Sequence, residues 1–200
     1  MSPRAVAIWI GLAAAIAVPI ALAATSPLLA WRGAAYIAAG FAGIIALALL
    51  LVQPLLAGGY LPGLAARRGR GVHRWVGIAL VTAVVAHVAG LWLSNPPDLI
   101  DALLLRSPTP FSLWGVIAMW ATFAAALLAV LRRRLRPKTW RLAHTAFAMV
   151  IGIGSVVHAL LVEGTMEPVS KAVFCGVVLV AIVKVVWDLR AWALLARRRG

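Results

Sequence analysis

The sequence GVHRWVGIALVTAVVAHVAG, residues 71–90, decides the fold class because it combines a long apolar stretch with a histidine near each end. Arg74 is its one charged residue. A helix that crosses the hydrocarbon core of a bilayer needs about 20 predominantly apolar residues, which is the length of this stretch. We therefore expect a membrane-spanning helix here.

The whole chain has the composition of a membrane protein. Of its 200 residues, 64% are hydrophobic and 12% are charged, whereas about 25% are charged in an ordinary soluble domain. A transmembrane β-barrel is excluded, because its strands alternate in polarity over about 10 residues. We expect an all-α membrane protein, a six-helix transmembrane bundle that forms a single domain over residues 1–200. The predicted spans lie near 5–24, 34–57, 75–93, 112–131, 143–162 and 172–192.

Basic residues are concentrated in two predicted loops. Loops 58–74 and 132–142 contain ten basic residues and no acidic one, and a third basic cluster, 197–199, follows the last span. Positively charged loops remain in the cytoplasm, so we expect both termini to be cytoplasmic and the protein to lie in a bacterial inner (plasma) membrane. Topology explains the net charge of +14 without nucleic acid, and the lipid bilayer is the expected partner.

The first span also has features of a secretory signal peptide. Arg4 precedes it, and small residues occupy 21–24 at its end. Its apolar region of about 19 residues exceeds the roughly 7 to 15 of a signal core. We expect residues 1–24 to be retained as a helix, with cleavage as the alternative.

The four histidines of the chain lie on two of the predicted spans, the third and the fifth. His73 and His87 are fourteen residues apart, and so are His144 and His158. Fourteen residues are just under four helical turns, so each helix presents two imidazoles on nearly one face, about 21 Å apart. These two spans run in the same direction, which places His73 level with His144 and His87 level with His158. By the predicted topology we name them the inner pair and the outer pair.

Paired imidazoles on facing helices can ligate a b-type haem from both sides of its iron. We expect two haem b groups, or one as the minimum, with haem iron as the bound metal. Zinc or copper would gather three or four ligands at one depth, with thiolates or carboxylates among them. For a single histidine, a hydrogen bond to a neighbouring helix is the simpler explanation. The repeated spacing on two helices favours haem.

Residues beside the histidines have two explanations each. Arg74 and Arg141 are candidates to bind haem propionates, because guanidinium pairs with carboxylates in a bidentate manner; they also serve as cytoplasmic anchors. Gly77, Gly90 and Gly154 would let a macrocycle approach the backbone, or they would permit tight packing of helices.

These features together resemble the ferric reductase-like transmembrane domain superfamily. It includes ferric reductases, NADPH oxidases and the haem-binding membrane subunit of a bacterial methionine sulfoxide reductase system. The motifs that match are GVHRWVG and AVVAHVAG on the third span, and TWRLAHT and GSVVHAL on the fifth. The resemblance covers about residues 34–192 and implies an inner haem on the inner pair and an outer haem on the outer pair.

The resemblance also implies a function in electron transfer. Fused reductases of this superfamily continue into a region that binds flavin and nicotinamide, but this sequence has no G-x-G-x-x-G motif after a strand, and it gives no signature of a flavin or quinone site. We expect an oxidoreductase membrane subunit whose donor is a separate reductase or quinol. Its acceptor would be ferric iron, oxygen or a periplasmic enzyme. No catalytic residue is expected, because two axial histidines fill the iron.

Two other functions are compatible with parts of this pattern. A cytochrome b membrane anchor subunit, which exchanges electrons between a dehydrogenase and quinone, would have the same haems. A transporter of solutes or metal ions would use the intramembrane histidines to relay protons or bind a cation. The transporter is less favoured, because such relays often use intramembrane carboxylates.

Overall fold

The computed structural model describes residues 2–64 and 66–189, and within them every regular element is helical. Six of the helices in this part of the chain are long and apolar enough to cross a membrane, which confirms the predicted bundle. Two 3₁₀ turns, η1 (Pro27–Leu29) and η2 (Leu131–Arg134), lie between α-helices. The α-helices are α1 (Pro3–Ala24), α2 (Ala34–Ala57), α3 (Ala66–Ser94), α4 (Pro96–Leu103), α5 (Pro110–Val130), α6 (Pro137–Leu161) and α7 (Pro168–Asp188).

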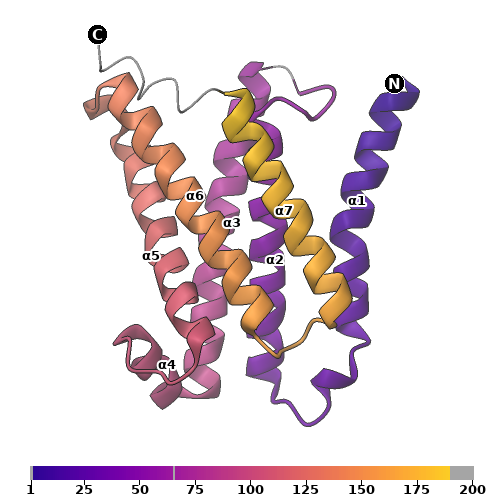
Figure 1. The fold of residues 1–200 in the computed structure, drawn as a ribbon, viewed down its shortest axis with the longest axis vertical. Helices are drawn as coiled ribbons and strands as arrows, with labels where there is room; N and C mark the ends of the chain where they lie inside the picture. The colour runs from indigo at the N-terminus through magenta and orange to yellow at the C-terminus, as the bar shows by residue number, and fades with distance from the viewer. Residues whose placement is uncertain (1, 65, 190–200) are drawn as a thin grey trace.

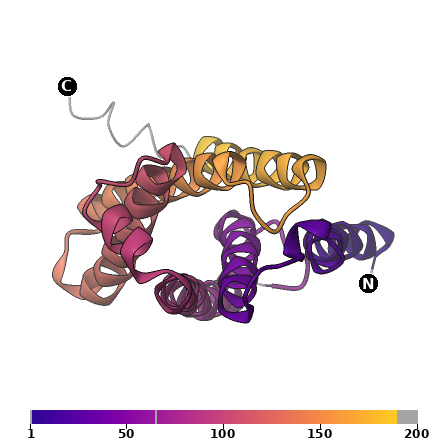
Figure 2. The same cartoon turned by 90° about the horizontal axis from the view of Figure 1, so that it is seen from below.

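The bundle is built from two antiparallel hairpins, α2–α3 and α5–α6, whose helices make the most extensive contacts (Figure 1). Helix α7 packs against α6 and α2, and α1 lies at the edge of the bundle against α7. Seen along the helices, α2 and α3 lie opposite α6 and α7 (Figure 2). The most deeply buried side chains, Leu51, Phe174 and Val178, pack where α2 and α7 meet.

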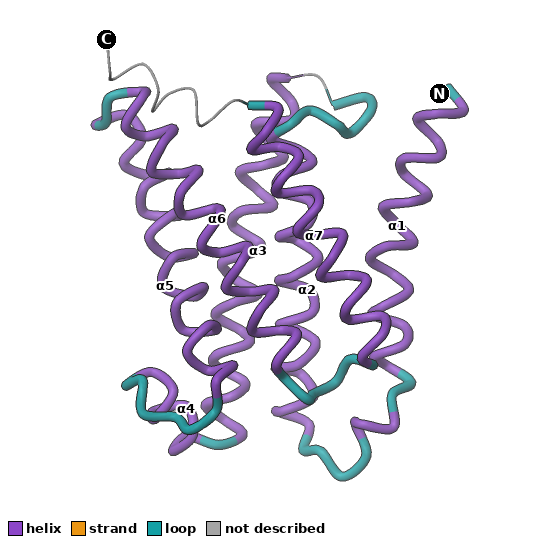
Figure 3. Tube along the Cα trace, viewed as in Figure 1, coloured by secondary structure: helices purple, strands orange, loops and turns teal. Residues whose placement is uncertain are grey.

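The loops lie at the two ends of the bundle (Figure 3). We call the end with the α2–α3 loop and η2 the basic end, because the arginine clusters lie there; the other is the opposite end. Proline, which has no backbone N–H to leave unbonded, is favoured in the first turn of a helix. Five of the described α-helices begin with one: α1, α4, α5, α6 and α7.

Two helices begin earlier than the spans predicted on them. Helix α3 begins at Ala66 and α6 at Pro137, whereas the apolar runs begin at 75 and 143. Arg74 and Arg141, expected in loops, therefore lie within helices. A hydropathy pattern detects the part of a helix inside hydrocarbon, while arginine is a good helix former that extends the helix beyond it. The last predicted span ends at 192, and residues 190–192 and 197–199 lie outside the described residues.

Helix α4 was not predicted. It lies at the opposite end, between α3 and α5 (Figure 1). The Asn95 side chain accepts a hydrogen bond from the Asp98 backbone N–H and caps the helix, and prolines fill its first turn. Asparagine, proline and an early aspartate form an N-terminal helix signal, but eight residues are too few to appear as a span.

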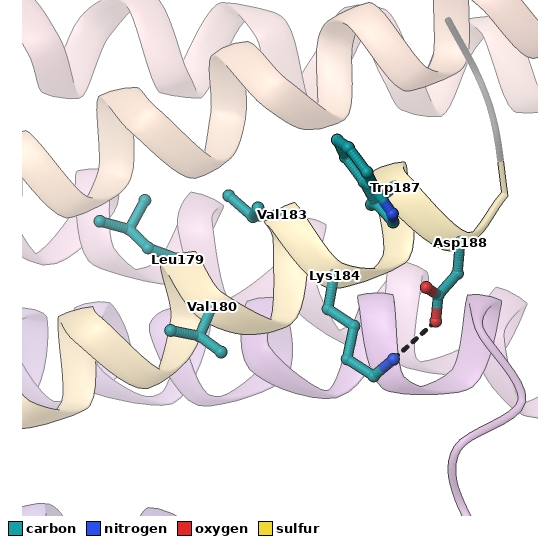
Figure 4. Close-up of a pocket in the computed structure, with 6 residues that line it drawn as sticks. All are labelled: Leu179, Val180, Val183, Lys184, Trp187 and Asp188. Carbon is teal, nitrogen blue, oxygen red and sulfur yellow. Dashed lines mark hydrogen bonds and ion pairs between the residues drawn. The ribbon is translucent and has the colours of Figure 1, made fainter. Parts of the chain in front are cut away.

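At the basic end, a polar link joins the α2–α3 loop to α7. Lys184 and Asp188 form an ion pair of 2.7 Å (Figure 4), and the Tyr60 hydroxyl donates a hydrogen bond to the same carboxylate. The Lys184 ammonium also lies 4.8 Å from the centre of the Tyr60 ring. Burial and the Asp188 carboxylate raise the pKa of Tyr60. The link therefore holds the α2–α3 loop beside the end of α7.

Candidate functional site

The structure brings together the histidines that the sequence places at equal depth. The ring centroids of His73 and His144 are 6.3 Å apart, and those of His87 and His158 are 6.2 Å apart. In each pair, one ring comes from α3 and the other from α6, one helix from each hairpin. The two pairs form two levels along the bundle, the inner pair toward the basic end.

Each histidine of the outer pair donates a hydrogen bond to a backbone carbonyl of its hairpin partner. His87 Nδ1 lies 2.7 Å from the Ala39 oxygen on α2, and His158 Nδ1 lies 2.8 Å from the Phe111 oxygen on α5. A carbonyl can only accept, so the proton is on Nδ1 and the lone pair of the neutral ring is on Nε2. This bond also fixes the ring orientation. Nε2 is therefore the nitrogen through which each outer imidazole could bind a metal.

Glycines allow these rings to reach the carbonyls. A Cβ on Gly43 would lie 3.0 Å from His87 Nδ1, and one on Gly115 would lie 2.7 Å from His158 Nδ1. Each glycine lies four residues after the accepting residue, so its own N–H is directed to the same carbonyl in the helix. Neither glycine could be singled out from the sequence, because they are two of 17 glycines and no local pattern distinguishes them.

The inner pair is held differently. Nδ1 of His73 and Nδ1 of His144 are buried and have no hydrogen-bond partner among the described residues. The Trp140 ring stacks on His144, with centroids 5.2 Å apart and an interplanar angle of 12°. The Arg132 guanidinium lies 5.0 Å from the centre of the Trp140 ring. Stacking, and not a hydrogen bond, supports this imidazole.

Among the described residues, the buried side-chain polar atoms without partners belong to the inner pair and its neighbours. The Gln53 side chain donates through Nε2 to the His73 carbonyl at 3.3 Å, while its Oε1 is unpartnered. An unsatisfied buried polar group costs about 1–3 kcal/mol, so hydrogen bonding is less complete at the inner pair than at the outer pair, where both Nδ1 atoms are bonded. Within the described residues, the buried unpartnered side-chain atoms are Gln53 Oε1, His73 Nδ1, Trp140 Nε1 and His144 Nδ1.

The glycines singled out near the histidines pack helices together. A Cβ on Gly90 would lie 2.8 Å from the Ala39 Cβ, and one on Gly154 would lie 3.1 Å from the Ala118 Cβ. Gly77 likewise faces α2, with the Gln53 amide at 3.1 Å. These contacts are within the two hairpins, so helix packing explains all three glycines.

Arg74 and Arg141 are exposed at the basic end. Arg74 follows His73 directly in α3, and Arg141 precedes His144 by three residues in α6. This position is compatible with binding of an acidic group beside the inner pair, which remains a prediction for both arginines.

The spacing of the rings fits two axial ligands of one iron. Imidazole nitrogen binds a metal ion at about 2.0 Å, and ring bonds of about 1.33 Å place the ring centre about 1.1 Å further away. Two imidazoles on opposite sides of an iron would then have centroids about 6.2 Å apart, close to both observed distances. The described residues contain no group of three or more histidine, cysteine, aspartate or glutamate side chains that could hold a metal ion. The donor set thus fits bis-histidine haem ligation better than a tetrahedral metal site.

Comparison with known families places most of the bundle in one family model. Residues 39–155 match the model of the ferric reductase like transmembrane component family. The matched segment begins at Ala39, contains both glycines of the outer pair and three of the histidines, and ends three residues before His158. No curated protein and no solved structure matches the chain. Because the family match spans more than half of the sequence, the chain belongs to the ferric reductase like transmembrane component family and is an integral membrane protein with a redox-related function.

Proposed function

We propose that the protein transfers electrons across a membrane by means of two haem b groups, one at each histidine pair. The observation that supports this most strongly is the pair of ring separations, 6.3 Å and 6.2 Å, at two levels of the bundle. A haem iron supplies a one-electron ferric–ferrous couple. Two such centres about 21 Å apart along the helices would connect the two halves of the bilayer.

In this proposal the residues of the chain bind and orient the cofactors. The four histidines would hold the haem irons through Nε2, and the Ala39 and Phe111 carbonyls would orient the outer two rings. Arg74 and Arg141 are the proposed propionate partners at the basic end. Because both axial positions would be filled by imidazole, no side chain is assigned a catalytic role, and electrons leave by outer-sphere transfer.

The direction of transfer follows from the proposed topology. The basic end would lie in the cytoplasm of a bacterium, with both termini, because basic loops are retained on that side. A separate reductase, or quinol, would then reduce the inner haem. The acceptor, which would be ferric iron, oxygen or a partner enzyme, would receive electrons outside, at the end of the bundle that holds the outer pair. The protein would be the membrane subunit of an oxidoreductase.

The alternatives have less support. A transporter that relays protons through histidines would benefit from neighbouring carboxylates, but within the described residues no carboxylate or thiol joins either pair as a third group. A cytochrome b anchor subunit for quinone would use the same haems with a different partner. The two electron-transfer functions therefore differ in donor and direction, and an assay with defined donors separates them.

Electron transfer across vesicles tests the proposal. Purified protein is reconstituted with ferricyanide trapped inside the vesicles, and dithionite, a membrane-impermeant reductant, is added outside. We expect the trapped ferricyanide to be reduced at a rate that depends on the amount of protein. Vesicles with the His158→Ala variant should show the slow rate of protein-free vesicles. Equal rates for the wild type and protein-free vesicles would overturn the proposed function.

A further inference from the structure

We infer that the outer pair gives its haem a lower reduction potential than the inner pair gives, because carbonyl hydrogen bonds over Gly43 and Gly115 make its imidazoles stronger electron donors. This inference rests on the proposed function, since it requires haem at both pairs. Gly43, Gly115 and the carbonyl groups of Ala39 and Phe111 are not ligands of the iron. Their proposed role is to lower the reduction potential of the outer haem.

The hydrogen bonds differ between the pairs on both helices. The outer histidines donate at 2.7 Å and 2.8 Å to Ala39 and Phe111, whereas Nδ1 is unpartnered in both inner histidines within the described residues. The contrast is complete on α6, where His144 has no backbone acceptor among the described residues; on α3, the Gln53 backbone lies near the His73 ring but does not meet the distance and angle of a hydrogen bond.

The sequence register explains why only one level has these bonds. Gly43 and Gly115 leave room for the outer rings, with a Cβ excluded at 3.0 Å and 2.7 Å. Fourteen residues further along the same helices, the interval that separates the histidines of α3 and of α6, the sequence has Ala57 and Ala129. These positions lie on nearly the same helix faces toward the basic end. At these two positions, alanine supplies the Cβ that glycine lacks.

A hydrogen bond from Nδ1–H to a carbonyl makes the opposite nitrogen, Nε2, more basic. A more basic ligand stabilises ferric iron more than ferrous iron, because the ferric ion has the greater positive charge. Reduction adds one electron to the iron and leaves both imidazoles bound, so the whole effect appears in the reduction potential. The outer potential is therefore lowered.

Charge at the basic end acts on the inner pair in the opposite sense. Arg132 lies over Trp140, which stacks on His144, and Arg74 and Arg141 lie on the same helices as the inner ligands. Positive charge nearby disfavours the ferric state, because that state is the more positive one. The reduction potential of the inner haem is therefore raised. The hydrogen bonds and the positive charge together widen the difference in potential between the two haems.

The order of potentials has a consequence for function. The outer haem, once reduced, is the stronger reductant of the two, which suits the site that passes electrons to an external acceptor. Transfer from the inner to the outer haem is then uphill in potential. A membrane voltage that is negative inside favours movement of an electron outward and offsets this difference.

A potentiometric titration of the purified, haem-loaded protein tests the inference, with reduction followed by haem absorbance and by the electron paramagnetic resonance of the ferric form. The wild type should titrate in two separate one-electron waves. Gly115→Ala should move the lower wave upward by at least a tenfold change in the ratio of reduced to oxidised haem, which is about 59 mV for one electron. Gly43→Ala should move it less, because its Cβ contact is longer. The upper wave should not move.

The matched control is Gly176→Ala, since a Cβ on this α7 glycine meets nothing within 4 Å; both of its waves should stay in place. If Gly115→Ala loses the outer haem, the titration of Gly43→Ala, the milder substitution, tests the inference in its place. Two haems with coincident waves in the wild type would overturn the inference, as would a variant that shifts the upper wave or neither wave. Wild-type protein without haem would instead overturn the proposed function.

Discussion

Gly90 on α3 links the packing of the α2–α3 hairpin to the orientation of His87. It lies one helical turn after His87 and faces Ala39, whose carbonyl accepts the His87 hydrogen bond. In Gly90→Ala, the added Cβ would lie 2.8 Å from the Ala39 Cβ and 3.2 Å from both the Ala39 Cα and the Ala35 oxygen. Backbone atoms of a helix cannot rotate away, so α2 and α3 must separate.

The size of this separation follows from the contact distances. Carbon atoms pack best at about 3.5–4.0 Å, so a contact of 2.8 Å must open by about 0.7 Å or more. The same movement would lengthen the His87–Ala39 bond from 2.7 Å to about 3.4 Å, where a hydrogen bond is largely lost. Overpacking of this kind costs about 1–3 kcal/mol of stability.

Two measurements check this prediction. Circular dichroism during heating should show a lower unfolding midpoint for Gly90→Ala, and the potentiometric titration should show an upward shift, or loss, of the lower wave alone. The matched control is Gly71→Ala on the same helix, where a Cβ meets nothing within 4 Å. If Gly90→Ala had the wild-type midpoint, haem content and potentials, the coupling of hairpin packing to the outer ligand would be refuted.

Three further predictions concern the ligands, a helix cap and the topology. His158→Ala should halve the haem content while the inner haem stays reducible by a cytoplasmic donor; a full haem content by pyridine haemochrome assay would count against ligation by His158. Glu167 accepts two backbone hydrogen bonds at 2.7 Å at the start of α7, and these bonds lower the pKa of its carboxyl group. The ionised carboxylate therefore stabilises the fold at pH values above the pKa of Glu167 in the unfolded chain. This stabilisation is lost as the pH falls through the lower pKa of the folded protein. Glu167→Gln should thus lower the thermal midpoint at neutral pH but not in acid, and a pH-independent difference would contradict the cap. An impermeant maleimide should label Arg134→Cys from the cytoplasmic side and Glu163→Cys from outside, and the reverse pattern would overturn the proposed orientation.

The spans could be predicted from the sequence because each apolar run is long enough to cross a bilayer, and the bundle follows from their number. The residues at which α3 and α6 begin could not be predicted from the apolar runs. The first turns of α3 contain arginines, which hydropathy excludes from a span although they continue the helix. Helix α4 is short and amphipathic, so it was detectable only from its cap at Asn95.

The arrangement of the histidines in two pairs at two depths could be predicted, because residues fourteen positions apart lie on nearly the same face of a helix. The carbonyl groups of Ala39 and Phe111 could not, because every residue has a carbonyl and only the packing of α2 on α3, and of α5 on α6, selects two of them. The contact of Trp140 with His144 could not be predicted either, because a tryptophan near the end of a span is common at the headgroup layer whatever lies beside it. Its stack on His144 depends on the helix continuing outward beyond the apolar run.

Haem content and ligation, measured together on the purified wild-type chain, test the central claim most directly. A pyridine haemochrome assay against protein concentration gives the number of haems, and electron paramagnetic resonance of the oxidised protein gives their ligation. The account predicts two haem b groups per chain, both low-spin with two imidazole ligands. A protein that purifies folded with no haem, or with one haem that persists in both His73→Ala and His158→Ala, would contradict it.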